Sequence, residues 1–471
     1  MNVVVRLLIL AGFMLLAGCM VGPDYKRPDV ETPAAFKEST GGWQPAQPKD
    51  ELDRGDWWSI YGDPTLDSLE GEIDISNQNI KAAEAAFRQA QAVVEQTRAS
   101  LFPIVDVNGS STTSGGERLK STTTLYNLAA TASWVPDLWG RIRRTIESNT
   151  ASAQASAADL GSAKLAAQAT LASDYFSLRT QDELKNLLDE TVIDDDKALQ
   201  IVRNQYTVGV AARADVIQAE TQLLGVQAQA VSVGVQRAQL EHAIAVLIGK
   251  PPTGFSLAAV PLAQNIPAIP AVMPSALLER RPDIAAAERK MAAANAQIGV
   301  ATAAWFPDLT LSATTEFTSS MLSKLLQASS NTWSFGPMIA ETVFDAGARS
   351  AVVSQSRANY DETVATYRQT VLTSFQQVED QLAALRILAR QAELENAVVA
   401  SAHKAEQLVL NQYKSGIVPY SSVLTAQTTT LNNEQTALAV RQSQFLASVA
   451  LIEALGGSWD ISQLEISETG H

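Results

Sequence analysis

The chain has 471 residues, of which 46% are hydrophobic and 18% are charged, and its formal net charge is −15. This composition is that of a folded globular protein and excludes an intrinsically disordered chain. The acidic balance disfavours a nucleic-acid-binding protein, which needs a basic face, so no nucleic-acid partner is expected.

The N-terminus carries the features of a secretory signal. Arg6 precedes an apolar run at residues 7–16, and the small residues Ala17 and Gly18 follow it. Ten residues of helix cover about 15 Å, roughly half the hydrocarbon thickness of a bilayer. We therefore expect residues 1–18 to be a signal peptide and not a membrane-spanning helix.

Cys19 is the single cysteine of the chain and ends the sequence "LAGC". This tetrapeptide resembles the bacterial lipobox, whose cysteine is acylated and becomes the mature N-terminus. We expect a covalent lipid on Cys19 and no other cofactor; the alternative is an ordinary signal peptide with an incidental cysteine. Removal of residues 1–18 deletes Arg6 and no acid, which leaves 34 basic and 50 acidic residues and a net charge of −16.

The distribution of proline outlines the domains. Prolines gather between Pro23 and Pro64 and between Pro251 and Pro282, whereas residues 137–250 contain none. Because proline interrupts helices, the proline-free tracts are where long helices are expected. We expect a lipid-anchored N-terminal segment at residues 19–70, a linker between two halves at residues 251–278 and a C-terminal tail at residues 458–471.

The two halves repeat one pattern. "ASLFPIVDVNGS" (99–110) aligns with "AAWFPDLTLSAT" (303–314), which places Phe306 204 positions after Phe102. "NQYTVGVAARADVIQAET" (204–221) aligns with "NQYKSGIVPYSSVLTAQT" (411–428) at an offset of 207. A period this long indicates duplication of a half-molecule and not a solenoid. The predicted repeats are residues 71–250 and 279–457.

Each repeat is expected to contain a helix, a β-hairpin and further helix, with the hairpins near residues 102–135 and 306–344. Alternate residues of the strands are apolar. The apolar faces are Tyr126, Leu128, Ala130, Ala132 and Trp134 in the first repeat and Leu309, Leu311, Ala313, Thr315 and Phe317 in the second. Eight residue steps cover about 26 Å, which matches the apolar band of an outer-membrane barrel. Pro337 and Glu341 are expected to interrupt the fourth strand.

Four strands cannot close a membrane barrel, so the chain is expected to oligomerise. Two copies would supply eight strands, a barrel filled by its own side chains, whereas three would supply twelve and begin to leave a lumen. Two uninterrupted helices are expected as well, at residues 141–207 and 346–415. Each would extend about 100 Å and end at a Tyr-x-x-Gly turn, with Gly209 or Gly416 as the stop.

The mature chain resembles the TolC-like outer-membrane factor family, in its lipoprotein branch of efflux ducts. The resemblance rests on motifs in one order: "GPDYKRP", "DWWSIYGDPTLDSL", "PDLWGRIRR", "RRPDIAAAERKMAAANAQIGVATAAWFPDLTL" and "FDAGAR", at residues 22–28, 56–69, 136–144, 280–311 and 344–349. It implies a homotrimer that combines a long α-helical barrel with a twelve-stranded transmembrane antiparallel β-barrel. It also implies the exit duct of a tripartite efflux system, with a periplasmic adaptor, an inner-membrane pump and outer-membrane lipid as partners.

Two groups of residues gain expected roles from this resemblance. Asp137, Gly140, Asp345 and Gly347 lie where strand becomes helix, as hinges in which aspartate caps the helix and glycine permits the bend. The periplasmic tip would contain the two turns and the residues that follow them, Tyr206, Gly209, Arg213, Asp215, Tyr413, Gly416, Val418 and Tyr420.

The gate is expected to differ from that of some relatives. Their gate aspartates are replaced by Val418, Ser422 and Thr425, so an aspartate ring is not expected. Closure is expected from apolar packing of Tyr413, Val418 and Tyr420 near the axis, with ion pairs of Arg213 and Asp215 between neighbouring tips. The alternative is that these residues only pack helices within one chain.

Enzymatic readings find little support in the sequence. Three histidines are present, none in a HExxH pattern, and phosphate-loop, GxGxxG and GxSxG motifs are absent. Neither catalytic nor metal-binding residues are expected. A surface or structural coiled-coil lipoprotein without transport activity is the remaining alternative, although it leaves the alternating strands unexplained.

Overall fold

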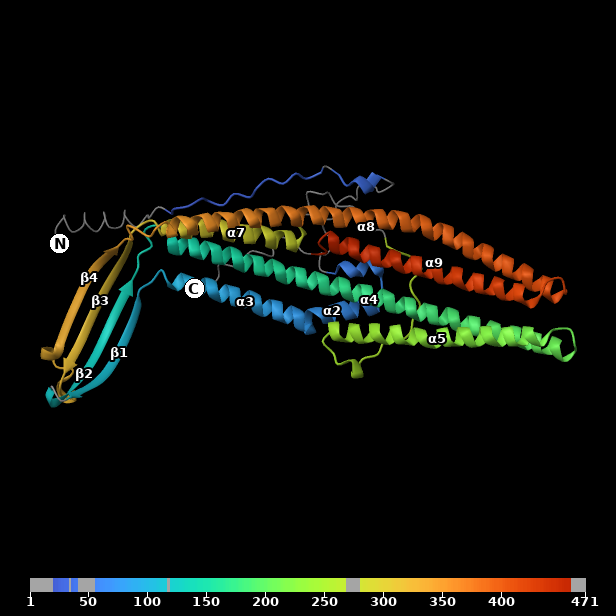
Figure 1. Cartoon of the computed structure of the whole chain (residues 1–471), viewed down its shortest axis with the longest axis horizontal. Helices are drawn as coiled ribbons and strands as arrows, with labels where there is room; N and C mark the ends of the chain where they lie inside the picture. Colours follow the sequence, from blue (N-terminus) through green and yellow to red (C-terminus); the bar gives the residue numbers. More distant parts are fainter. Residues whose placement is uncertain (1–19, 34, 41–55, 117–118, 268–279, 459–471) are drawn as a thin grey trace. The chain divides into compact units, whose positions relative to one another are not determined.

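A computed structural model describes residues 20–33, 35–40, 56–116, 119–267 and 280–458 (Figure 1). The chain forms two compact units, each of which draws on both predicted repeats. Unit 1 comprises residues Met1–Val30, Ala85–Ala157 and Ala286–Gln369. Unit 2 comprises residues Glu31–Glu84, Ala158–Ala285 and Thr370–His471. None of the described helices is long and apolar enough to cross a membrane.

The order of elements is the same in the two halves of the chain, and corresponding helices have equal lengths. Helices α3 (Gln78–Ala99) and α7 (Pro282–Ala303) each have 22 residues. Helices α4 (Arg141–Thr207) and α8 (Ala348–Lys414) each have 67 residues, and α5 (Arg213–Leu247) and α9 (Tyr420–Ala454) each have 35. The expected helix at residues 141–207 is confirmed. The second begins at Ala348 and not at residue 346, because Ala346 and Gly347 have positive φ angles of 50° and 91°.

Unit 1 contains a four-stranded antiparallel sheet in the order β1-β2-β3-β4. Its strands are β1 (Ile104–Gly116), β2 (Leu119–Trp134), β3 (Asp308–Ser319) and β4 (Asn331–Ala340) (Figure 1). The pairing of β2 with β3 joins the hairpins of the two halves. Two short 3₁₀ helices, Leu322–Lys324 and Ala328–Ser330, connect β3 to β4.

Unit 2 is built around an apolar core between helices. The 3₁₀ helix η2 (Trp57–Tyr61) and helix α2 (Pro64–Ser76) add Trp58, Leu66 and Ile73 to this core. The Tyr61 hydroxyl lies 2.7 Å from Ser448 Oγ, and the ring of Phe176 packs 4.7 Å from that of Phe445. The "DWWSIYGDP" sequence therefore fixes α2 to the long helices.

A single carboxylate directs the start of α2. Asp63 Oδ1 accepts hydrogen bonds from the backbone N–H groups of Thr65 and Leu66, at 2.9 and 3.3 Å. Its other oxygen accepts from the Tyr175 hydroxyl of α4 at 2.5 Å. Pro64 occupies the first helical position, where its missing N–H is not needed. Asp63 therefore caps one helix and ties it to another.

Candidate functional site

The sheet of unit 1 carries one continuous apolar face. Residues directly opposite in an antiparallel pair project from the same face. Leu128 lies opposite Phe317, Ala132 opposite Ala313, and Trp134 opposite Leu311, so the two predicted faces form one surface. The outer strands extend it with Val105 and Val107 of β1 and Trp333, Phe335, Pro337 and Ile339 of β4. Trp333 is 78% exposed and Val107 is 70% exposed in the single chain.

The expected interruption of the fourth strand at Pro337 is wrong. Pro337 lies opposite Leu311 within the apolar face, and β4 keeps its pairing with β3 from Asn331 to Ala340. Glu341 lies outside β4, which ends at Ala340. The alternation in β4 therefore continues through the proline.

The other face of the sheet is largely polar. Thr131 lies opposite Thr314 and Ser133 opposite Ser312. Asn127 Nδ2 donates a hydrogen bond to Glu316 Oε1, and the Thr318 hydroxyl donates to the same oxygen at 2.9 Å. The sheet thus has one face suited to lipid and one suited to water.

The first connection from strand to helix is organised by Asp137. Asp137 Oδ1 accepts the backbone N–H of Ile142 at 2.9 Å, and Oδ2 accepts that of Arg143 at 3.0 Å. These bonds occupy two donors of the first turn of α4 that would otherwise be free. Gly140 has a φ of 78°, and a Cβ there would lie 2.5 Å from Met20 Cγ. This position therefore requires glycine both for its conformation and for its close contact.

The second connection repeats this arrangement. Asp345 Oδ1 accepts the N–H of Gly347 at 3.0 Å, and Oδ2 accepts the backbone and the side chain of Arg349 at 3.2 and 2.6 Å. Gly347 has a φ of 91°. The Arg349 guanidinium also lies 4.9 Å from the ring centre of Trp305. In both connections an aspartate precedes the helix and contacts an arginine within its first turn.

Two matching turns end the long helices in unit 2. Gly209 N–H donates to Tyr206 O at 3.0 Å, and Val210 N–H donates to Gln205 O at 2.8 Å. The second turn has the same pair of bonds, from Gly416 to Tyr413 O and from the next residue to Gln412 O, at 2.8 and 2.9 Å. This is the Schellman pattern, in which glycine adopts the left-handed conformation; Gly209 and Gly416 have φ angles of 78° and 74°.

Behind these turns lies an apolar cluster, here called the tip cluster, made of Leu199, Val202, Ala219, Leu223, Tyr420 and Val423. Tyr420 is 3% exposed, and its ring lies 5.4 Å from that of the half-buried Tyr413. The Tyr413 hydroxyl donates to Gln205 Oε1 at 2.5 Å, which links the two turns. Burial raises the pKa of Tyr420 to about 12. The Tyr420 ring therefore packs between helices of its own chain, and closure near the axis by Tyr413, Val418 and Tyr420 stays a prediction.

The remaining predicted tip residues have different environments. Val418 is half-buried, Arg213 is exposed, and Tyr206 is 45% exposed. Asp215 Oδ2 accepts the Ala212 N–H at 3.1 Å and so caps the start of α5. The expected ion pairs of Arg213 and Asp215 would join neighbouring chains, so they stay a prediction.

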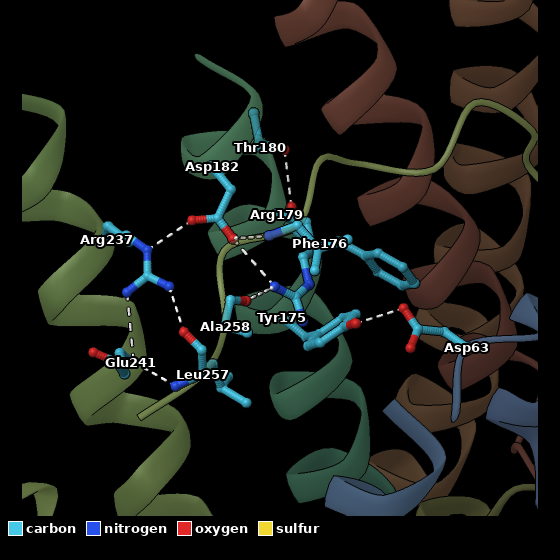
Figure 2. Close-up of polar contacts among 11 residues, drawn as sticks. Asp63, Tyr175, Phe176, Arg179, Thr180, Asp182, Arg237, Glu241, Leu257 and Ala258 are labelled. Atoms are coloured by element: carbon cyan, nitrogen blue, oxygen red, sulfur yellow. Dashed lines mark hydrogen bonds and ion pairs between the residues drawn. The ribbon is translucent and has the colours of Figure 1, made fainter. Parts of the chain in front are cut away.

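Sequence reasoning missed a charged network that holds the segment after α5. Figure 2 shows Asp182 between two arginines: Arg179 Nη1 lies 3.1 Å from Oδ2, and Arg237 Nε lies 2.7 Å from Oδ1. The same guanidinium groups donate to the carbonyl oxygens of Ala258 and Leu257, both at 2.7 Å. The side chains of Arg179 and Asp182 are 5% and 1% exposed. No local motif indicates this network, because the backbone carbonyls of Leu257 and Ala258 lie far in the sequence from the arginines that bond to them.

Cys19 lies outside the described residues. Within the part of the chain that the structure describes, no group of three or more His, Cys, Asp and Glu residues could hold a metal ion.

Known proteins are similar to this chain over most of its length. The family model described as outer membrane efflux protein matches residues 71–250 and 273–457. Over 460 residues the chain is 30% identical to the probable efflux pump outer membrane protein TtgC of Pseudomonas putida, with 94% of each chain covered. It is 28% identical to the probable outer membrane lipoprotein SilC of Salmonella typhimurium, over 96% of this chain and 99% of that protein. The solved outer-membrane channel OprN is similar with a TM-score of 0.86 at 28% identity, over 93% of this chain and 99% of that one.

Proposed function

This chain belongs to the outer membrane efflux protein family, and we propose that it forms the outer-membrane exit duct of a tripartite efflux system. In this role it passes small molecules to the exterior from an inner-membrane pump and a periplasmic adaptor. The observation that carries the proposal is the continuous apolar face of the four-stranded sheet, which meets lipid while the polar face meets water. TtgC, which matches 94% of this chain, is named a probable efflux pump outer membrane protein, so the structural-lipoprotein alternative is not retained.

The functional assembly is proposed to be a homotrimer with two barrels. Three chains contribute twelve strands, which close a transmembrane β-barrel with no open sheet edge in lipid. The paired long helices, each about 100 Å, form an α-helical barrel. The equal helix lengths of the two halves support an origin by duplication of one unit.

Exposed apolar stripes support association of the helices between chains. On α5, Ile217, Leu224 and Val231 recur every seven residues and are 53%, 58% and 77% exposed. On α8, Leu394 follows Ile387 by seven residues and Leu408 follows Leu394 by fourteen, and the three are 55%, 53% and 63% exposed. A seven-residue period is typical of helices that pack along one seam. We propose that these stripes are buried between neighbouring chains.

A covalent lipid on Cys19 is the proposed second attachment to the outer membrane. Cys19→Ser should abolish acyl labelling and stop processing by the lipoprotein signal peptidase, as mass spectrometry of the mature N-terminus would show. An unmodified N-terminus in the unaltered protein, or one at another residue, would refute the lipid anchor.

Single-channel conductance of the purified protein in a planar lipid bilayer tests the duct itself. Discrete openings are expected from a trimeric species isolated on a native gel. A preparation that binds vesicles but conducts no ions would contradict the exit-duct proposal and return the structural lipoprotein to consideration.

A further inference from the structure

The "GPDYKRP" motif takes part in none of the features described above, yet its side chains bond to three helices of unit 1. Residues 20–27, here called the strap, follow Cys19 directly and lie outside helices and strands. Val21 N–H donates to the Trp139 carbonyl at 3.2 Å, five residues after the last residue of β2. The start of the strap is therefore bound to the connection between β2 and α4.

Arg144 of α4 is the central contact of the strap. Its guanidinium donates to the carbonyls of Val21 and Gly22, at 3.2 and 3.4 Å, and to Asp24 Oδ1 at 2.8 Å. A further bond to Glu147 Oε2, at 2.8 Å, holds the group from its own helix. The side chain is 2% exposed. A buried arginine whose donors reach two backbone carbonyls is a binding group for a chain segment, and not a surface charge.

Close packing of glycines seats the strap. Gly22 has a φ of 95°, and a Cβ there would lie 2.4 Å from the Cα of Gly299 in α7. A Cβ at Gly299 would lie 2.9 Å from Arg144 Cδ, and a Cβ at Gly140 would meet Met20. Three glycines from three segments thus leave room for the strap.

The strap is also held further along. Asn295 Nδ2 donates to the Pro23 carbonyl at 3.0 Å, and the Tyr25 hydroxyl donates to Glu288 Oε1 at 2.5 Å. Arg27 donates to the hydroxyl of the fully buried Tyr367 of α8, at 3.0 and 3.1 Å. The strap therefore bridges α4, α7 and α8 within unit 1.

We propose that the strap positions the acylated chain end beside the end of β2 that leads into α4. Arg144 is the main positioning residue of the strap. Consecutive Cα atoms are 3.8 Å apart, so fixing Met20 against Gly140 fixes the attachment point of the lipid next to the start of α4. The acyl chains then enter the membrane beside the sheet that must insert. This inference rests on the proposed lipid anchor and outer-membrane duct.

Limited trypsin digestion of purified, acyl-labelled trimers tests whether Arg144 holds the strap. Lys26 is exposed, but its neighbours Tyr25 and Arg27 are bonded to α7 and α8, so cleavage after Lys26 requires the strap to detach. Arg144→Gln should accelerate release of the labelled peptide at least about tenfold. Arg141→Gln is the matched control, because Arg141 is 57% exposed and makes only a 3.9 Å ion pair with Asp308. Equal release from the two variants overturns the proposal.

Two further variants cover the case in which Arg144→Gln fails to fold. Tyr25→Phe and Tyr367→Phe each remove one hydroxyl from the strap contacts and leave the aromatic ring. Each should accelerate release about two- to fivefold with an unchanged melting temperature of the trimer. Release at the rate of the unaltered protein from both would overturn the role of these contacts.

A double-mutant cycle separates lipid positioning from a purely structural role. Arg144→Gln should slow appearance of trimers in the outer membrane when the chain is acylated. It should have no further effect in a chain whose residues 1–19 are replaced by an ordinary secretory signal, which is cleaved but carries no lipid. An equal effect in both backgrounds, or none in either, overturns the proposal. Absence of acyl label from the unaltered protein would instead refute the lipid anchor. The trypsin digestion would still test the strap, with the released peptide identified by N-terminal sequencing.

Discussion

Trp134 of β2 lies directly opposite Leu311 of β3, so the hairpins of the two halves share one apolar face. Leu311→Arg would place a charge on that face, at a cost of roughly 2–4 kcal/mol at the bilayer midplane. We expect this variant to form few trimers on a native gel of outer-membrane extracts.

Ser312→Arg is the matched control, one residue along the same strand. Ser312 lies opposite Ser133 on the polar face, where a charge would meet water. It should assemble normally and change the single-channel conductance. Equal trimer yields for the two variants would contradict the assignment of the lipid-facing side.

Periodicity was sufficient to predict these strands because alternation is a local property of the sequence. It failed at Pro337, because whether a strand tolerates proline depends on how the strand is paired on each side. It failed also at Ala346, whose φ of 50° follows from the bend and not from its own preference. Strand order and backbone conformation at a bend are long-range properties, which one stretch of sequence does not contain.

The network around Asp182 predicts a large loss of stability on its removal. Asp182→Asn would leave the buried Arg179 guanidinium without its anion, whereas the partly exposed Arg237 would keep its ion pair with Glu241 (Figure 2). Removal of one partner from such a buried cluster costs roughly 3–5 kcal/mol. The melting temperature of the variant should therefore fall markedly.

Asp189→Asn is the control on the same helix. Asp189 pairs with Lys185 at 2.5 Å, but both side chains are more than 40% exposed. An exposed pair of this kind contributes about 0–1 kcal/mol, so the melting temperature should barely change. Similar losses in the two variants would mean that the Asp182 network is not a structural anchor.

Tip residues illustrate the limit of motif matching. The two Tyr-x-x-Gly sequences predicted both turns, because the glycine stop is local. The motif alone could not distinguish Tyr413, which donates a hydrogen bond to Gln205, from Tyr206, which is exposed. Nor did a motif indicate the contacts of Arg144, because the carbonyls that accept its hydrogen bonds lie more than a hundred residues away in the sequence.

Tyr413→Phe should loosen the link between the two turns. It removes the hydroxyl that donates to Gln205 and keeps the ring against Tyr420. A hydrogen bond contributes about 1 kcal/mol, so each tip should open roughly fivefold more often and the closed-state conductance should rise. Tyr206→Phe is the control, since within the described residues its hydroxyl has no hydrogen-bond partner; a rise in that variant alone would reverse the assignment.

Asp195 of α4 lies near the tip cluster and is 3% exposed. Its Oδ2 has no hydrogen-bond partner among the described residues. Burial is the main cause that raises the pKa of Asp195 from 3.8 to about 6, and the nearby Asp194 and Glu406 add to it, while a hydrogen bond with Gln222 acts against it. At neutral pH the tip therefore contains a buried, ionised carboxylate whose charge destabilises the folded chain.

The pH dependence follows from the direction of this shift. As the pH falls through about 6, Asp195 binds a proton in the folded chain, whereas in the unfolded chain it binds one only near pH 3.8. The contribution of Asp195 to stability therefore increases as the pH falls from 6 to 3.8 and is lowest above pH 6. Asp195→Asn should raise the melting temperature at pH 7.5 and reduce its difference from that at pH 5. Asp189→Asn is again the control, because Asp189 lies on the same helix, is 49% exposed and pairs with Lys185. If Asp195→Asn melts lower at pH 7.5 and keeps the full pH difference, the carboxylate stabilises the tip through its charge, and the assignment is wrong.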